Sequence, residues 1–535
     1  MIRNPVLPGF NPDPSICRVG DDVYIATSTF EWYPGVQIHH SRDLVHWTLA
    51  ARPLQRASQL DLRGNPDSCG VWAPCLSYAQ ERFWLVYTDV KRFEGNFKDA
   101  HNYIVTAPGI EGPWSDPVYV NSSGFDPSLF HDDDGSTWFI NMLWNHRTAS
   151  IGGSPKAPAF DGIVLQAWDA VAQRLVGPVT NIYRGTAVGL VEGPHLFKRD
   201  GWYYLVTAEG GTGYGHAVTM ARSRSLHGPY ETHPQLHVVS SRAAPDAPLQ
   251  RAGHGQVVEM PDGSTYLAHL CSRPLPGTRR SPRGRETALQ RCRWGDDGWL
   301  YLEHAGMVPA VDVRTPGPDV APPHREAVRR SFAGCTALPS EFQWLRTPEP
   351  GRLFTLTGES LRLTGRESVG SWFEQSLVAR RQEDERLRVE TGLSRFAPVS
   401  YQQAAGLTHY YNRHKFHALM VTWEEGLGRV LTLLSCPGDW PDQRLQFPLA
   451  EPVPLPAEGP VRLAADIDGA TLQFQADWGA GWQPVGPVLD ASVISDEGGR
   501  GEHASFTGAF LGMLAFDTSG RACTADFTHF DYLPR

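Results

Sequence analysis

Three acidic residues of the 535-residue chain stand at matching places in the sequence. Asp13, Asp126 and Glu192 each open a short apolar segment that contains a proline, as in Asp126-Pro127-Ser128-Leu129-Phe130. Hydrolysis of a glycosidic bond needs one protonated carboxyl group and a second, ionised carboxylate. Their pKa values must be driven apart by their surroundings, and a third acid can assist by like-charge repulsion. The three residues therefore point to acid–base cleavage of a sugar.

Two further segments of the same kind open with a tryptophan and a histidine, Trp72 and His254. Alone, the acidic segments would be interpreted as turns, Trp72 as a core residue and His254 as a structural histidine. The equivalent placement of all five favours a shared site, because turns require only small or polar residues. An indole also offers a flat face for the apolar side of a pyranose.

The elements that position these residues repeat about every 60 positions. Each segment is followed by a turn and an aromatic-rich strand, whose aromatic positions are Tyr24, Trp84, Trp138, Tyr203 and Tyr266. A unit of this length with about four strands has the size of one propeller blade. Five units over residues 5 to 310 predict a five-bladed β-propeller. The innermost strand of a blade starts near the central axis, so the five opening residues are expected to face one cavity.

The last 200 residues have strand-like alternation without the blade period, which predicts a sandwich of two antiparallel β-sheets. A proline-rich stretch of low periodicity precedes them. We therefore expect an all-β protein with a propeller over residues 1–315, a linker over 316–330 and a β-sandwich over 331–535.

Composition excludes several other classes of protein. The net charge of −10, without a basic tail, argues against nucleic acid or an anionic membrane as the main partner. No apolar run approaches the roughly 18 residues that span a bilayer. Residues 1–9 lack the apolar region of a signal peptide, so we expect a cytoplasmic protein. The eight scattered cysteines match no zinc pattern and are expected to be reduced.

These motifs together resemble glycoside hydrolase family 43, in particular its bacterial β-xylosidases. The resemblance covers essentially the whole chain. It rests on residues 4–15, on Ser28–Val36, on Gly70–Pro74, on Gly124–Phe130, on Val191–His195, on Gly284–Thr287 and on Phe506–Phe510.

The resemblance implies a role for each candidate residue. Asp13 would be the general base that activates water, Glu192 the general acid, and Asp126 the residue that tunes the pKa of Glu192 and orients it. Substrate binding would involve Arg285, Trp72, Phe30, His254 and Phe506. The second domain would be a concanavalin-like jelly roll that brings Phe506 to the mouth of the active site.

The implied activity is that of an inverting, exo-acting β-1,4-xylosidase. It would release xylose from the non-reducing end of xylo-oligosaccharides, with side α-L-arabinofuranosidase activity. An inverting enzyme places its two carboxyl groups roughly 6.5–9.5 Å apart to admit water. Members of the family often form dimers or tetramers, so a homo-oligomer is expected.

No cofactor or metal is expected to be required. Some relatives place a divalent cation such as calcium at the propeller axis, which would lie near His254. The run His131–Gly135 lacks the twelve-residue calcium-loop pattern and is interpreted as a hairpin turn.

Three other functions remain open at this stage. The arabinofuranosidase activity could be the primary one. A non-catalytic carbohydrate-binding propeller is a different class, which the three acids disfavour because clustered carboxylates repel one another. A sialidase is a weaker alternative, since residues 133–138 resemble a single Asp-box that the other blades do not repeat.

Overall fold

The structure is a computed structural model that describes residues 1–535 except 94–96, 123, 148–158, 319, 439–443 and 499–504. Its regular structure is almost entirely β-strand, and in the described ranges the 3-10 helices are the short η1 (Pro350–Arg352) and η2 (Ala491–Val493). No helix in the described part of the chain is long and apolar enough to cross a membrane. The expectation of an all-β protein is confirmed.

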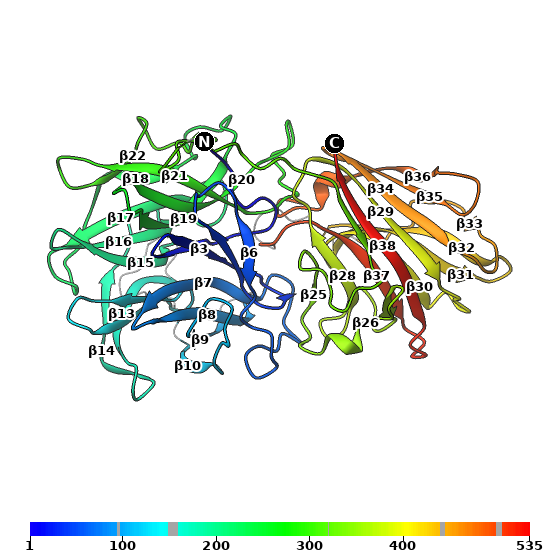
Figure 1. The fold of residues 1–535 in the computed structure, drawn as a ribbon, viewed down its shortest axis with the longest axis horizontal. Helices are drawn as coiled ribbons and strands as arrows, with labels where there is room; N and C mark the ends of the chain where they lie inside the picture. The colour runs from blue at the N-terminus through cyan, green and yellow to red at the C-terminus, as the bar shows by residue number, and fades with distance from the viewer. Residues whose placement is uncertain (94–96, 123, 148–158, 319, 439–443, 499–504) are drawn as a thin grey trace.

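Five four-stranded antiparallel sheets form the N-terminal domain in the described residues, so the predicted five-bladed propeller is confirmed (Figure 1). The first sheet contains β2 (Ser15–Val19), β3 (Asp22–Thr27), β5 (Gln37–Ser41) and β6 (Thr48–Ala51). The second contains β7 (Gly70–Ala79), β8 (Arg82–Arg92), β9 (Asp99–Ala107) and β10 (Val118–Asn121). The third contains β11 (Ser128–His131), β12 (Thr137–Trp144), β13 (Phe160–Asp169) and β14 (Arg174–Tyr183). The fourth contains β15 (Glu192–Arg199), β16 (Trp202–Glu209), β17 (Ala217–Ser223) and β18 (Glu231–Ser240). The fifth contains β19 (Gln250–Glu259), β20 (Thr265–Ser272), β21 (Glu286–Trp294) and β22 (Leu300–Leu302).

The repeated turn and aromatic strand explain the blades. The turn before each aromatic strand closes a hairpin between the first two strands of a blade, as at Asp200 and Gly201, which have φ values of 49° and 72°. The run His131–Gly135 is such a turn between β11 and β12, as predicted. The innermost strands pack against one another around the axis, with β2 against β7 and β19. The two ends of the propeller segment meet where β1 (Ile2–Arg3) pairs with β23 (Asp312–Val313).

The C-terminal domain is the predicted sandwich of two sheets, with a core of inward-facing apolar side chains. One sheet has the order β26 (Phe354–Leu356), β27 (Leu361–Thr364), β38 (Thr524–Pro534), β29 (Arg386–Arg395), β34 (Val461–Asp468), β35 (Thr471–Asp477) and β36 (Gln483–Asp490), and β24 (Val328–Ser331) also pairs with β38. The other has the order β33 (Val453–Pro454), β32 (Gly428–Pro437), β31 (Lys415–Glu424), β30 (Gln403–Asn412), β37 (Phe510–Asp517), β28 (Ser376–Arg381), β25 (Gln343–Leu345) and β4 (Trp32–Tyr33).

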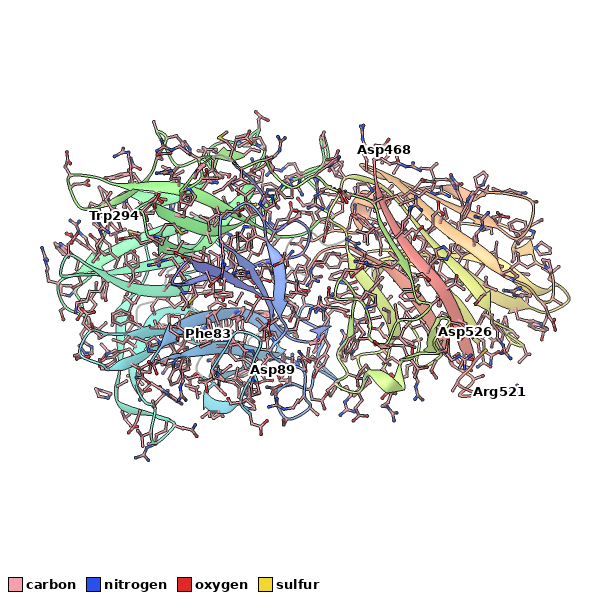
Figure 2. The ribbon with its side chains drawn as sticks, viewed as in Figure 1. Phe83, Asp89, Trp294, Asp468, Arg521 and Asp526 are labelled. Carbon is pink, nitrogen blue, oxygen red and sulfur yellow. The ribbon has the colours of Figure 1, made fainter. Side chains whose placement is uncertain are left out.

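The two domains share one β-sheet, because β4 belongs to the propeller segment but pairs with β25 of the sandwich. The indole of Trp32 stacks on the ring of Phe510, with the ring centres 3.6 Å apart. Trp294 lies at the outer rim of the propeller, and Asp468 and Asp526 lie at opposite ends of the sandwich (Figure 2). This joint fixes the sandwich against the face of the propeller that carries the site.

Candidate active site

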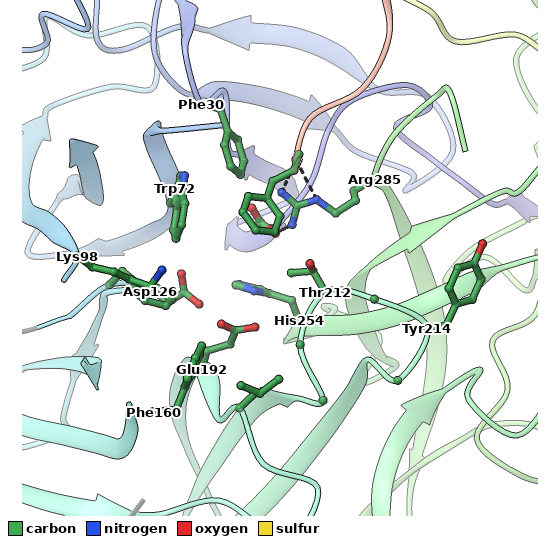
Figure 3. Close-up of a pocket in the computed structure, with 18 residues that line it drawn as sticks. Phe30, Trp72, Lys98, Asp126, Phe160, Glu192, Thr212, Tyr214, His254 and Arg285 are labelled. Carbon is green, nitrogen blue, oxygen red and sulfur yellow. Dashed lines mark hydrogen bonds and ion pairs between the residues drawn. The ribbon is translucent and has the colours of Figure 1, made fainter. Parts of the chain in front are cut away.

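Five residues that lie in the innermost strands, or just before them, line one cavity of about 330 Å³. They are Asp13, Trp72, Asp126, Glu192 and His254. Arg285, Phe30 and Phe506 line the same cavity, so the structure brings together all eight site residues predicted from the sequence. The carboxyl groups of Asp126 and Glu192 and the ring of His254 point into a common space (Figure 3).

Local backbone distortion explains how the strands present these side chains. Asp13, Asp126 and His254 have φ values of 54°, 53° and 47°, in the left-handed region that residues other than glycine seldom adopt. The strands that contain Trp72, Glu192 and His254 each change register beside the site residue. Bulges re-aim side chains, and strained backbone gathers at functional sites. Each blade therefore departs from regular strand geometry where it reaches the cavity.

Asp13 is held by two donors. The hydroxyl of Ser28 donates to its Oδ2 at 2.7 Å, and Nη1 of Arg285 donates to its Oδ1 at 2.9 Å. Arg285 is itself buried and also donates from Nε and Nη2 to the carbonyl oxygen of Phe506, at 3.1 and 2.6 Å. The guanidinium group thus joins the acid of the first blade to the loop of the second domain.

Glu192 and Asp126 have different surroundings from Asp13. Burial and the charge of Asp13 raise the pKa of Glu192 to about 8, against opposing contributions from Arg285 and Lys98. None of the described residues donates a hydrogen bond to its carboxyl group. Burial, and then the charges of Glu192 and Asp13, hold the pKa of Asp126 well above its usual range. The amide of Gly193 donates to Asp126 Oδ2 at 3.0 Å, which links Asp126 to the backbone beside Glu192.

The aromatic walls meet from both domains. The ring centre of Trp72 lies 5.8 Å from that of Phe30 and 5.9 Å from that of Phe506. Ser68 holds Trp72 and Phe506 in place. Its carbonyl oxygen accepts from the Trp72 indole at 3.0 Å, and its hydroxyl accepts from the Phe506 amide at 3.1 Å. The sandwich therefore contributes one side of the cavity.

His254 faces the acids across the cavity. Burial lowers its pKa, and Arg285 adds to this effect while the charge of Asp13 opposes it. Gly193 is required beside it, because a Cβ there would lie 3.0 Å from the ring carbon Cε1. Among the described residues, no three His, Cys, Asp or Glu side chains are grouped as metal ligands. The expectation that no metal is required stays a prediction.

The sequence interpretation missed five parts of the cavity lining, namely Lys98, Phe125, Phe160, Leu190 and the loop Gly210–Gly215. Lys98 Nζ donates to the Phe93 carbonyl oxygen at 2.8 Å and lies 4.5 Å from the centre of the Trp144 ring. Burial lowers the pKa of Lys98 to about 8, and the neighbouring Cys69 and Glu192 oppose this shift. The glycines at 210, 211, 213 and 215 were a visible signal for a loop close to a ligand. Lys98 had no such signal.

Protein-family models cover nearly all of the chain. Residues 2–300 match the family described as "Glycosyl hydrolases family 43", and residues 329–533 match the "Beta xylosidase C-terminal Concanavalin A-like domain".

Similar proteins and structures agree with these models. The chain is 58% identical to "Xylosidase/arabinosidase 43B" of Humicola insolens over 100% of this chain and 98% of that protein. It is 45% identical to a "Beta-xylosidase" of Bacillus subtilis over 99% of each chain. The crystal structure of a xylan β-1,4-xylosidase from Bacillus halodurans superposes with a TM-score of 0.94 at 49% identity, covering 100% of both chains. With the site geometry and both family models in agreement, the chain belongs to glycosyl hydrolase family 43.

Proposed function

We propose that this glycoside hydrolase removes single β-1,4-linked xylosyl units from the non-reducing ends of xylo-oligosaccharides, with inversion at the anomeric carbon. The observation that carries the proposal is the contrast within one cavity between Asp13, which is bound by Arg285 and Ser28, and Glu192, whose pKa burial raises to about 8. Two carboxyl groups in opposite protonation states are what this reaction needs.

The proposed roles follow from these surroundings. Glu192, with its raised pKa, is protonated at neutral pH and receives no hydrogen bond from the described residues, so it gives its proton to the leaving oxygen. Asp13 takes a proton from the water that attacks the anomeric carbon. Asp126 contacts the amide of Gly193 and thereby orients the segment that carries Glu192. Arg285 keeps Asp13 in place and presents the guanidinium to sugar hydroxyls.

The proposal of exo action rests on the walls of the cavity. Phe506 of the sandwich and Trp72 and Phe30 of the propeller enclose one side, and the cavity volume of about 330 Å³ suits one or two sugar rings rather than a long chain. A small cavity walled on one side favours the terminal unit of an oligosaccharide.

The names of relatives support a second activity on arabinose. The Humicola insolens relative is named a xylosidase/arabinosidase, and a Bacteroides ovatus relative, 32% identical, is named a non-reducing end α-L-arabinofuranosidase. We therefore propose a side α-L-arabinofuranosidase activity. Turnover of an aryl β-xyloside and an aryl α-L-arabinofuranoside at equal concentration measures the ratio of the two activities. Faster turnover of the arabinofuranoside would make that activity the primary one.

The role assignment has a direct test. Glu192→Ala is expected to keep far more of its rate on an aryl xyloside with a good leaving group than on xylobiose, because only a poor leaving group needs the proton. Asp13→Ala is expected to lose at least about a thousandfold on both substrates, since water must be activated in each case. Proton NMR of early hydrolysis should show α-xylose first. Early β-xylose, or equal losses in both variants on both substrates, would refute the mechanism.

We also propose that the chain forms a homo-oligomer, a dimer or tetramer, as the family resemblance implies. Exposed apolar side chains of the sandwich, such as Phe447 and Tyr401, are consistent with such contacts. Sedimentation velocity of the full chain gives the subunit number, and a single species of about 59 kDa would contradict this proposal.

A further inference from the structure

A second cavity of about 610 Å³ lies between the propeller and the sandwich and is lined by residues of both domains. None of the acids Asp13, Asp126 and Glu192 lines it, so it is separate from the active site. Its propeller side includes Gln37 and His39 of β5 and Arg52, which follows β6. Its sandwich side includes Arg381, the last residue of β28.

Two guanidinium groups in this cavity converge on one neutral oxygen. Arg52 donates to Gln37 Oε1 from Nε at 3.1 Å and from Nη2 at 2.6 Å. Arg381 donates from Nη1 to the same Gln37 Oε1 at 3.2 Å and to Gln343 Oε1 at 2.6 Å. Among the described residues, neither arginine has a carboxylate within ion-pair distance. Two positive charges from two domains thus lie side by side with only amide and carbonyl oxygens as acceptors.

Burial makes this arrangement costly. Arg381 is only 5% exposed, and its Nη2 has no hydrogen-bond partner in the described structure. Burial, and then the charge of Arg52, holds the pKa of Arg381 well below its usual range. His39 is half-buried beside them, and its Nδ1 also lacks a partner among the described residues. Desolvation, together with both arginine charges, lowers its pKa to about 3. Buried charges in proteins are normally paired, because an unpaired charge loses its hydration without compensation.

The acids that line the cavity are already engaged elsewhere or lie at the surface. Glu341 pairs with Arg330, and Glu383 and Asp384 pair with Arg325 at 2.9 and 3.3 Å. Glu383 also lies 3.4 Å from Arg380, and Glu326 is exposed. Arg273 pairs with Glu286 at 2.6 Å. Arg3 also lines the cavity but is exposed to solvent. Among the described residues, the sheltered positive charge left without a carboxylate partner is therefore that of Arg52 and Arg381.

We propose that Arg52, Arg381 and His39 form a binding site for a tetrahedral oxyanion of the size and charge of phosphate, which joins the propeller to the sandwich. A doubly charged oxyanion matches two guanidinium groups in charge. Its oxygens can accept from donors that arrive from different directions, which is the recognition that arginine forks favour. An anion bound by both domains stabilises the joint that places Phe506 over the active site.

Inorganic phosphate is the probe for a direct test. Titration calorimetry of the full chain at constant ionic strength in potassium chloride should show saturable binding at one site, and millimolar phosphate should raise the thermal midpoint by mass action. Sulfate should act in the same way, and acetate should bind at least tenfold more weakly. Absence of saturable heat with phosphate would overturn the proposal.

Three variants separate a built site from a general salt effect. Arg52→Gln should weaken phosphate binding at least tenfold. Gln37→Glu places an internal carboxylate between the guanidinium groups. It should therefore raise the thermal unfolding midpoint in the absence of phosphate and abolish the further rise that phosphate causes. Arg329→Gln removes an exposed arginine that pairs with Asp531 and should respond like the parent chain. An equal rise of the thermal midpoint with phosphate in the parent chain and all three variants would show a general effect of salt on the protein surface and contradict the proposed site.

Discussion

Glu192 and Asp13 are both buried carboxyl groups, and their nearest neighbours give them opposite tasks. Arg285 and Ser28 bind the carboxylate of Asp13, while the carboxyl group of Glu192 receives no donor from the described protein and lies close to acidic neighbours. The difference arises from a few contacts within one cavity. The pH dependence of catalysis should therefore report on individual residues.

The raised pKa of Glu192 predicts an alkaline limit to activity. The general acid acts in its protonated form, which is lost as the pH rises through about 8. The value of kcat/KM for xylobiose should therefore fall about tenfold per pH unit above that point, and less steeply for an aryl xyloside with a good leaving group. Initial rates between pH 5 and 10 measure this limb. Its absence on xylobiose would contradict a proton donor with a raised pKa.

The alkaline fall in kcat/KM could report either Glu192 or Lys98, since the pKa of Lys98 is also about 8. A variant of Lys98 distinguishes the two. The positive charge of Lys98 lowers the pKa of Glu192, so Lys98→Met should move the alkaline limb to higher pH. If the limb instead reported loss of the Lys98 proton, it would vanish in this variant. The direction of the change therefore distinguishes the two residues.

Site residues differed in how far the sequence could predict them. Asp13, Trp72, Asp126, Glu192 and His254 were found because a repeated unit gives them one register, and a propeller converts register into position around an axis. Arg285, Phe30 and Phe506 were named only through the family resemblance. Lys98 was missed because its surroundings consist of Phe93, Trp144 and Glu192, which come from different blades and share no spacing with it.

At the scale of elements, the segment around Ser68 connects the two aromatic walls. Ser68 has a φ of 60°, its amide donates to Glu31 at 3.1 Å, and its hydroxyl accepts from the amide of Phe506. The pairing of β4 with the sandwich holds Glu31 and Trp32 in place beside it. The sequence did not predict this pairing, because a two-residue strand has no periodicity and its partner lies more than 300 residues away.

Ser68→Gly tests whether this hydroxyl positions Phe506. Glycine accepts the left-handed backbone, so the variant removes the hydrogen bond without adding strain. Loss of about 1 kcal/mol predicts a kcat/KM for xylobiose about fivefold lower. Gln80→Gly is the matched control, since Gln80 also has a left-handed backbone, with a φ of 54°, but does not line the cavity. Unchanged kinetics in Ser68→Gly would show that the hydroxyl does not position the wall.

At the scale of the whole molecule, the two domains are expected to unfold together because they share a β-sheet and the stacked pair Trp32 and Phe510. Phe510→Ala should destabilise the chain by about 3 to 5 kcal/mol, the usual cost of removing a buried phenylalanine. It should also lower kcat/KM, because the loop of Phe506 leads into β37 at this residue. Phe474→Ala removes an equally buried ring from β35, away from the propeller, and should lower stability while leaving kcat/KM unchanged. Calorimetry and xylobiose kinetics of both variants check this, and equal activities in the two would show that the stacked pair does not couple the joint to the site.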